Sequence, residues 1–293
     1  MGLKTTISFL INHPLGSIDK IGTLSKFFKW QLVSRYAPSY SFIVPYVNDT
    51  KLVVKRGMTG ATGNIYTGLH EFNDMGFLLH FLREGDLFTD IGANVGSYTV
   101  LAAGAIKAET ISFEPVPATF RHLSDNVAIN ALHKLVTCYN IGLGNENGNI
   151  HFTSGKDTMN HVATEKDAGQ TIEVPVRRLD VLEGKAPILM KIDVEGFETE
   201  VLKGAHNTLA NTNLNAIIIE LNGSGDRYGY DEEKIHQQLL GNGFNPYSYE
   251  PLSRTLSEVT SFGTHNTIYI RDVNLVRERT KSAEKFKVLG HEV

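Results

Sequence analysis

The amino-acid sequence predicts an α/β protein in which helices cover both faces of a mostly parallel sheet. From about residue 85 onward, short apolar runs typical of buried strands alternate with helical segments. The first run leads into "FTDIGANVGSYTV" (88–100), where an acid and two glycines stand between a strand and a helix. Open α/β sheets bind ligands at such turns. The length of 293 residues, with 41% apolar and 20% charged residues, is ordinary for a globular chain.

The alternation predicts seven strands in the sheet. They are expected at Leu87–Ile91, "TISFE" (110–114), "LVTCYN" (135–140), "PILMKID" (187–193), "AIIIELN" (216–222), "NPYSYE" (245–250) and "NTIYIRD" (266–272). Helices are expected from Val95, in "PVPATF" (115–120), after Gly196 and from Asp231. Residues 144–180 break the alternation with hairpin-like material.

The first 57 residues differ from the rest in charge. They carry eight Lys or Arg and two acids, a net charge of +6. The rest of the chain has 20 basic and 30 acidic residues, a net charge of −10, and the total is −4. Ile21, Leu24, Phe28 and Leu32 recur at helical spacing. Lys20, Lys26, Lys29 and Arg35 surround them. Such a helix suits peripheral contact with an anionic membrane or a partner, or an accessory helix packed on the core with a solvated basic side.

A strand is expected at "KLVVK" (51–55), and a glycine-rich segment, "GMTGATGNIYTG", follows at 57–68. The segment lacks the Gly-Lys-Ser/Thr ending of a phosphate-binding loop, so we expect a flexible cover over the site. Tyr66, His70 and Glu71 lie in or just after it. A histidine in this setting is more often structural than catalytic.

Composition narrows the classes of function. The acidic main body argues against nucleic acid as a partner. Cys138 is the one cysteine, which excludes an intramolecular disulfide and cysteine-cluster metal sites. The sequence has no apolar run long enough for a membrane span and no clear signal peptide, so we expect a cytoplasmic protein.

The turn after the first strand predicts a nucleoside-type ligand other than a dinucleotide. A dinucleotide fingerprint would place glycines where Gly92, Asn94 and Ser97 stand, so two of three are missing. Asp90 precedes Gly92 by two residues, and Glu114 ends the next strand. A carboxylate at Glu114 can accept both hydroxyls of a ribose, and Asp90 can reach the other end of the ligand through amides or water. The alternative is that both acids are turn and capping residues.

Several segments together resemble the FkbM family of S-adenosylmethionine-dependent methyltransferases. They are "FTDIGANVGSYT", "ISFEPVPATFRHLSDNVAIN", "YNIGLGNENG", "VPVRRLDVL" and "LMKIDVEGFETEVLKGA", within about residues 63–250. The resemblance implies a class I methyltransferase (Rossmann-like) fold and O-methylation of a hydroxyl on a sugar, glycan or polyketide-like small molecule. It also implies that S-adenosyl-L-methionine is bound by Asp90, Gly92, Ala93, Asn94, Gly96 and Glu114, with the adenine near Asn140.

On this basis we expect three parts in the chain. Residues 1–60 would be a basic, partly helical extension, 61–275 the methyltransferase domain, and 276–293 a C-terminal tail.

The segment "MKIDVEGFE" (190–198) is the predicted source of catalytic groups. Lys191 and Asp193 project to the same side of a strand and can pair, and Glu195 lies on the turn that follows. Removal of a proton from an alcohol needs a base, for which Asp193 and Glu195 are the candidates, followed by His70. We predict no metal. Two alternatives stay open: a cation held by these acids with Glu220 or Asn222, or a purely structural ion pair with Glu195 as a helix N-terminal acid.

Two other classes of protein compete with this interpretation. A nicotinamide-dependent oxidoreductase would share the strand–turn–helix start and the ribose acid, but needs a glycine at position 97. A non-catalytic module that kept only the fold would be expected to lose the charged residues of "KIDVEG", all of which are present. "NPY" (245–247) lacks one proline of the amino-methyltransferase motif and follows a late strand, which argues against a nitrogen acceptor.

Overall fold

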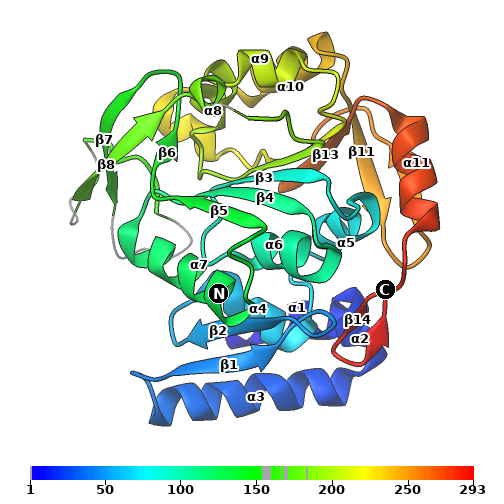
Figure 1. Cartoon of the computed structure of the whole chain (residues 1–293). Coiled ribbons are helices and arrows are strands. Elements are labelled where there is room, and N and C mark those ends of the chain that lie inside the picture. The colour runs from blue at the N-terminus through cyan, green and yellow to red at the C-terminus, as the bar shows by residue number, and fades with distance from the viewer. Residues whose placement is uncertain (1, 154–159, 166, 168–170, 183) are drawn as a thin grey trace.

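A computed structural model describes residues 2–153, 160–165, 167, 171–182 and 184–293. Its centre is an eight-stranded sheet with helices on both faces (Figure 1). The helices are α1 (Leu3–Asn12), α2 (Pro14–Ile18), α3 (Lys20–Tyr36), α4 (Thr59–Thr67), α5 (Phe72–Phe81), α6 (Ser97–Val100), α7 (Pro117–Ile129), α8 (Glu198–Lys203), α9 (His206–Ala210), α10 (Glu232–Gly241) and α11 (Val273–Ser282). A π-helical segment, Leu101–Ile106, continues α6.

The strands divide into one large and three small sheets. The large sheet has the order β12-β11-β13-β10-β9-β3-β4-β5. Its strands are β3 (Leu87–Ile91), β4 (Glu109–Phe113), β5 (Val136–Tyr139), β9 (Leu189–Ile192), β10 (Ala216–Glu220), β11 (Asn245–Glu250), β12 (Thr255–Glu258) and β13 (Asn266–Ile270). The small sheets contain β1 (Ser41–Pro45) with β2 (Lys51–Lys55), β6 (Gly142–Leu143) with β8 (Thr171–Arg177) and β7 (Gly148–Thr153), and β14 (Lys287–Val288) with β15 (His291–Glu292).

The order of the central strands creates the position for a ligand site. The chain runs outward from β3 through β4 to β5 and then returns to β9, which lies on the other side of β3. These strands and β10 are mutually parallel, so their carboxyl ends meet at one edge. The helices that follow β3 and β9 lie on opposite faces, which opens a crevice at this switch point.

The expectation of a mostly parallel sheet is confirmed, but the predicted number of seven strands is wrong. All seven predicted strands are present, and β12 pairs antiparallel with β11 as an eighth, at the edge. Its sequence, "TLSE", buries only Leu256, because an edge strand packs little of its surface. Such a segment lacks the apolar pattern from which a strand is predicted.

Two hydrophobic cores lie on the two faces of the sheet. Successive residues of β10 illustrate the division, since Ile218 belongs to the core with α5 and α7, and Ile217 and Ile219 belong to the core with α8 and α10. This division follows from the alternation of side chains along a strand. Strands buried on both faces read as continuous apolar runs, and "AIIIE" is one.

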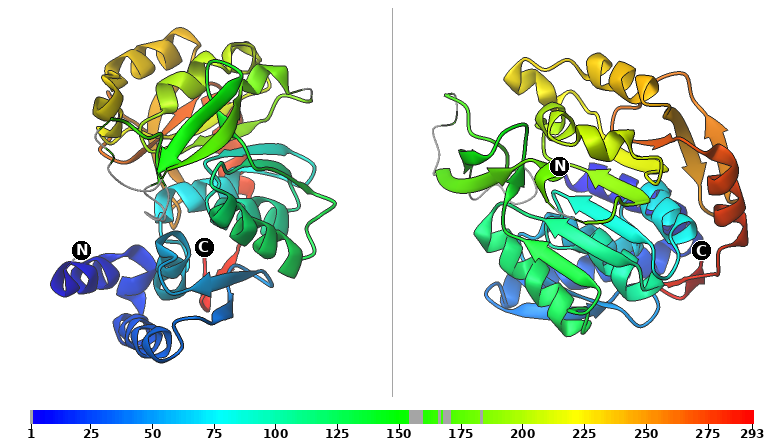
Figure 2. Two further views of the ribbon diagram at one scale, coloured as in Figure 1. Left: turned by 90° about the vertical axis from the view of Figure 1, so that its left-hand side faces the viewer. Right: turned by 45° about the horizontal axis from the view of Figure 1, so that its top comes forward.

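The segments before α5 form a further layer beneath the helices of one face (Figures 1 and 2). Leu10, Phe27 and Trp30 from α1 and α3 are buried in the larger core. A hydrogen bond joins β2 to α7, since the side-chain oxygen Oδ1 of Asn126 accepts from Val53 N at 2.6 Å. The first 60 residues are thus integrated with the main body, and the domain limits given above stay a proposal.

The glycine-rich segment forms the helix α4, so the expectation of a flexible cover is wrong. Gly63 allows this helix to pack closely against His70. A Cβ atom on Gly63 would lie 2.5 Å from the ring of His70, and the carbonyl of Gly60 accepts a hydrogen bond from Ser97 Oγ at 3.2 Å. Glycine here serves close approach rather than chain mobility.

The C-terminal residues also pack on the main body. α11 covers α5, and Phe286, Val288 and Val293 join the larger core. Within the part of the chain that the structure describes, no helix has both the length and the apolar character needed to cross a bilayer.

Candidate active site

A cavity of about 360 Å³ lies at the carboxyl ends of the parallel strands. Its size is within the range of small-molecule sites. Its walls come from the turn after β3, the end of β4, the loops after β5 and β9, the end of β10, and the start of α4 and α5. The lining includes Gly60, His70, Glu71, Asp90, Gly92, Ala93, Asn94, Ser97, Tyr98, Glu114, Ile141, Gly142, Lys191, Asp193, Glu195 and Glu220.

The turn after β3 requires glycine for two reasons. Gly92 has a φ of +77° and Gly96 a φ of +86°, which are left-handed conformations that disfavour other residues. A Cβ atom on Gly92 would also lie 1.8 Å from the carbonyl oxygen of Asp193. The absence of a side chain lets the β3 turn and the β9 turn approach each other across the switch point.

Glu114, at the end of β4, is bound to this turn. One carboxylate oxygen accepts a hydrogen bond from Asn94 N at 3.0 Å, and the other accepts one from Val116 N at 2.9 Å. Burial raises the pKa of Glu114 to about 7, although the two amide donors act in the opposite direction. Each oxygen retains acceptor capacity toward the cavity, so hydroxyl groups that donate to it would stabilise the charged form.

Asp90 is the innermost acid of the site. It is 1% exposed and accepts a hydrogen bond from Thr99 Oγ1 at 2.7 Å. Burial raises its pKa to about 6, against the influence of Lys191. Asp90 and Lys191 are opposite each other in the register of β3 and β9, which explains this influence.

Among the described residues that line the cavity, Lys191 is the one lysine or arginine. Its ammonium group is 2.7 Å from Asp193 Oδ2 and lies over the ring of Tyr98 at 4.7 Å, so the predicted Lys191–Asp193 contact is confirmed. Burial acts to lower the pKa of Lys191, but Asp193, Glu71 and Asp90 together raise it above its ordinary value. The lysine is therefore a fixed charge rather than a proton carrier at neutral pH.

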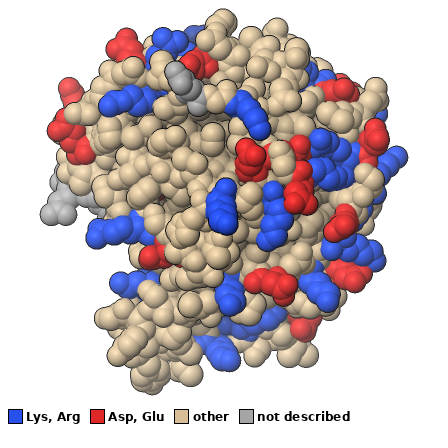
Figure 3. All heavy atoms as spheres, viewed as in Figure 1, with Lys and Arg blue, Asp and Glu red and all other residues tan. Residues whose placement is uncertain are grey.

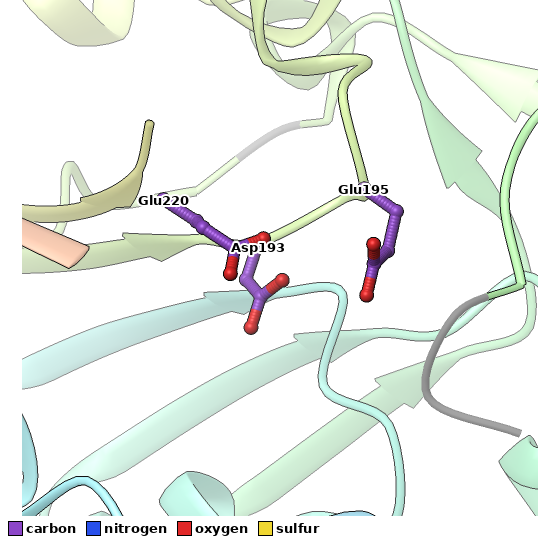
Figure 4. Close-up of side chains that lie close together, drawn as sticks. All are labelled: Asp193, Glu195 and Glu220. Atoms are coloured by element: carbon purple, nitrogen blue, oxygen red, sulfur yellow. The ribbon is translucent and has the colours of Figure 1, made fainter. Parts of the chain in front are cut away.

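Three carboxylates converge beyond this ion pair. Asp193, Glu195 and Glu220 each place an oxygen so that the three lie within 4.8 Å of one another. They come from the end of β9, the turn after it and the end of β10, and Figure 4 shows all three directed to the same side. Oxygen ligands at this separation could hold a divalent cation, and without one the carboxylates repel one another.

This repulsion adds to the effect of burial on the pKa values. Burial, followed by Asp193, raises the pKa of Glu195 to about 7. Burial, followed by Asp193 and Glu195, raises the pKa of Glu220 to about 9. At neutral pH Glu220 therefore carries a proton, whereas Glu195 exchanges its proton readily.

Two buried polar atoms of the lining have no hydrogen-bond partner within the described chain. They are His70 Nδ1 and Glu220 Oε2. Burial lowers the pKa of His70, against the influence of Glu71, so the ring is neutral. Because buried polar groups are normally satisfied, these atoms retain unused hydrogen-bonding capacity next to the cavity.

Three residues predicted from the sequence, Gly96, Asn140 and Asn222, lie outside the cavity wall. Gly96 shapes the turn after β3 through its left-handed φ of +86°. Asn140 donates hydrogen bonds to the carbonyls of Glu114 and Pro115 at 2.8 and 2.9 Å, and its neighbours Ile141 and Gly142 line the cavity instead. The side chain of Asn222 accepts a hydrogen bond from Ser224 N at 2.9 Å and belongs to a turn. Of the two candidates to complete an acid cluster, the structure brings only Glu220 to Asp193 and Glu195.

The sequence did not predict the roles of Glu198 and Tyr98. Glu198 accepts hydrogen bonds from Val194 N and Gly196 N at 3.0 and 3.3 Å, which fixes the turn that carries Glu195. Glu195 itself has a φ of +56°, a conformation that this turn imposes. The role of Glu198 could have been predicted, because an acid in the first turn of a helix, two residues after Gly196, often binds the backbone amides that precede the helix. No pattern in the sequence indicated that Tyr98 faces Lys191.

A comparison with known families identifies the chain. The model of the methyltransferase FkbM domain matches residues 90–246, which is more than half of the chain. The chain belongs to the FkbM methyltransferase family. The matched range begins at Asp90 and includes the turn after β3, Glu114 and the three clustered carboxylates.

The relatives of this chain include two curated proteins. Hexuronic acid methyltransferase AglP of Haloferax volcanii is 30% identical over 152 residues, which cover 51% of this chain and 61% of that protein. Methyltransferase 1 of Beauveria bassiana is 29% identical over 147 residues, which cover 41% and 59%. The chain thus spans about three fifths of the length of these relatives. A solved structure of methyltransferase FkbM from Methylobacillus flagellatus has 16% identity and a TM-score of 0.45, and the match covers 71% of this chain and 54% of that one.

Proposed function

We propose that this FkbM methyltransferase transfers the methyl group of S-adenosyl-L-methionine to a hydroxyl group of a sugar or glycan, with Glu195 as the base. The observation that carries this proposal is the position of Glu195 in the same cavity as the glycine turn and Glu114. A cofactor held by the turn and an acceptor held near Glu195 would then meet at the switch point of the sheet.

The donor set of the cavity fits this cofactor. Glu114 offers two carboxylate oxygens for ribose hydroxyls, and the side-chain-free Gly92 admits close approach. Ile141, Gly142 and Leu143 provide an apolar and narrow wall suited to an adenine ring. Asp90 and the neighbouring backbone would receive the amino-acid end. The bound cofactor supplies an activated methyl group on a sulfonium, and the acidic cavity favours this positive charge.

The relative named hexuronic acid methyltransferase supports a sugar acceptor. The cavity also supports a hydroxyl rather than an already deprotonated group, because the acids Glu195 and Glu220 face it and Lys191, the one lysine or arginine among the described lining residues, is paired with Asp193. A neutral hydroxyl enters such a site without the repulsion that an anionic acceptor atom would meet. A carboxylate elsewhere on the acceptor would have to remain outside the acid cluster.

Glu195 is the best placed of the candidate bases. Its pKa of about 7 means that it is substantially ionised at neutral pH and still basic enough to accept a proton. Asp193 is engaged with Lys191 at 2.7 Å, and Glu220 is protonated at this pH because its pKa is about 9. We assign to Glu195 the removal of the acceptor proton, and to Glu220 a hydrogen bond to an acceptor oxygen. The ion pair of Lys191 with Asp193 would stabilise the wall of the cavity next to these two acids.

The experiment that tests this function has a binding arm and a turnover arm. Calorimetry should detect binding of S-adenosylmethionine and of its demethylated product, but not of NAD at the same concentration. Incubation with methyl-labelled cofactor and a panel of free and nucleotide-linked hexoses and hexuronic acids should label at least one sugar. Tight binding of NAD with no response to S-adenosylmethionine would instead favour the oxidoreductase alternative. Cofactor binding without labelling of any hydroxyl compound would reject the acceptor class.

A further inference from the structure

Helix α3 has two apolar faces, of which only one is covered. The inner face carries Phe27 and Trp30, which are buried in the larger core together with the small residues Thr23 and Ser34. Phe27 packs edge-on against Tyr66 of α4, with ring centroids 5.3 Å apart. This face alone accounts for the attachment of α3 to the protein.

The outer face carries three of the four residues in the stripe that the sequence pattern singled out, and the fourth, Leu24, is half-buried. Ile21, Phe28 and Leu32 are 84%, 52% and 58% exposed, and Tyr36 continues the stripe at the end of the helix. At 100° per residue these side chains point almost opposite to Phe27 and Trp30. Of the 11 large exposed apolar side chains in the described part of the chain, eight lie in its first 43 residues. They are Leu3, Ile18, Ile21, Phe28, Leu32, Tyr36, Tyr40 and Ile43. A concentration of this kind marks an interaction surface.

The charges around the stripe indicate what covers it. α3 contains four basic residues and no acid. On the helical projection, Arg35 flanks one side of the stripe and Lys29 the other, and Lys20 lies farther round the helix toward Phe27. The nearest acid in the sequence, Asp19, is occupied as the N-cap of α3, where it accepts a hydrogen bond from Gly22 N at 2.9 Å. The lower left of Figure 3, where Figure 1 shows α3 and β1, is mostly uncharged surface with Lys and Arg beside it.

We propose that the outer face of α3 binds an anionic lipid membrane, with Ile21, Phe28 and Leu32 inserted between the headgroups and the flanking basic residues on the lipid phosphates. An apolar stripe bordered by basic residues on a helix that lies flat on a surface is the pattern of an interfacial helix. Pairing of two copies through this face would bring Lys29 and Arg35 of both copies together without an acid to compensate them, so a membrane is favoured over a second copy.

The position of α3 also relates this surface to the cavity. α3 packs on α4, and α4 reaches the cavity at Gly60. One helix therefore separates the proposed membrane surface from the site. The proposal does not depend on the identity of the acceptor, and it holds even if the proposed reaction is wrong.

Sedimentation with lipid vesicles tests the proposal on the full chain. The protein should sediment with vesicles of phosphatidylcholine and phosphatidylglycerol, much less with phosphatidylcholine alone, and less as salt is added. The double substitution Phe28→Ser/Leu32→Ser should lower the partition coefficient at least about tenfold. Lys29→Gln/Arg35→Gln should lower it about fivefold for each charge removed. The matched control is Val181→Ser/Leu252→Ser, two similarly exposed apolar residues elsewhere on the surface, which should leave it unchanged.

Thermal unfolding verifies that the variants fold, which is expected because the substituted side chains are exposed. Equal sedimentation of the parent and the Phe28→Ser/Leu32→Ser variant would overturn the proposal. It would also be overturned if the parent bound no vesicles and sedimented in solution as a dimer that this substitution dissociates, because the face would then join two copies.

Discussion

The carboxylate of Glu114 accepts a hydrogen bond from the backbone amide of Asn94 at 3.0 Å, so that the end of β4 is bound to the glycine turn after β3. Two adjacent strand ends thereby form one binding surface. The same carboxylate also accepts from Val116 N at 2.9 Å, which orients both of its oxygens. A ligand that binds to Glu114 therefore meets a preorganised acceptor rather than a mobile side chain.

Replacement of Glu114 should weaken cofactor binding more than it affects folding. Glu114→Gln keeps an acceptor but loses the charge, and charged hydrogen bonds contribute about 1.5–3 kcal/mol each, so we expect at least about tenfold weaker binding. Glu114→Ala should weaken it further. The measurement is calorimetric titration with S-adenosylmethionine. Glu109→Gln, an exposed acid at the other end of β4, is the control and should bind normally. Unchanged affinity in Glu114→Ala would remove this residue from the binding site.

The stability of the ligand-free protein should fall as the pH rises. Burial raises the pKa of Asp90 to about 6 and those of Glu114, Glu195 and Glu198 to about 7, from ordinary values near 4. The folded state therefore holds protons that the unfolded chain releases. The stabilisation is complete below the unfolded pKa values and is lost as the pH rises through about 6 to 7.

Denaturant unfolding measured at about pH 5 and about pH 8 checks this sign. The free energy of unfolding should be higher at the lower pH, and Glu114→Gln should reduce the difference because its side chain does not titrate. Burial lowers the pKa values of His13 and His80 from 6.5 to about 4, which acts in the opposite direction below about pH 6.5, so the comparison of the parent with Glu114→Gln decides. An equal pH dependence in both proteins would contradict the assignment. Bound cofactor should also reduce the difference between the free energies of unfolding at the two pH values, because hydroxyl groups that donate to Glu114 stabilise its charged form.

Glu195→Gln and Asp193→Asn should separate catalysis from structure. Loss of a base lowers turnover about 10²- to 10⁴-fold, so Glu195→Gln should retain cofactor affinity and stability but lose turnover by this factor. Asp193→Asn leaves Lys191, which is 3% exposed, without its nearest anion, and should lower the free energy of unfolding by about 3 kcal/mol. Glu200→Gln, on α8 beyond the cavity, is the control for both.

The measurements are turnover with saturating cofactor and acceptor, and chemical unfolding. Normal turnover in Glu195→Gln would refute its role as the base, and His70, whose Nδ1 atom is buried in the same cavity, would be tested next by His70→Gln. Unchanged stability in Asp193→Asn would show that Asp90 and Glu71 suffice to hold the lysine.

Removal of divalent metal ions should leave the turnover unchanged if Glu195 is the base. The alternative is that turnover requires a divalent cation, because the three carboxylates have oxygen atoms within 4.8 Å of one another, which are the ligands such a cation prefers. Turnover is compared with and without a chelator, and after addition of Mg²⁺. Loss on chelation with recovery on Mg²⁺ would assign Asp193, Glu195 and Glu220 to a metal that activates the acceptor oxygen. Glu220→Gln should abolish such recovery.

The sequence by itself determined the parallel sheet and the residues of the turn. Buried parallel strands read as apolar runs whatever surrounds them, and "AIIIE" is such a run. Gly92 and Gly96 were recognisable because a left-handed backbone excludes most other residues. The pairing of Lys191 with Asp193 followed from the two-residue repeat of a strand, which is a local property.

Tertiary structure alone decided which distant groups meet. Glu220 joins Asp193 and Glu195 because β10 pairs with β9 in one register, and no spacing in the sequence specifies that register. The sequence also did not determine that Ile21, Phe28 and Leu32 point outward, since a helix with two apolar stripes can bury either one. Phe27 and Trp30 are buried because their rings pack against Tyr66 of α4 and Phe42 of β1, and only the packed fold brings these partners together.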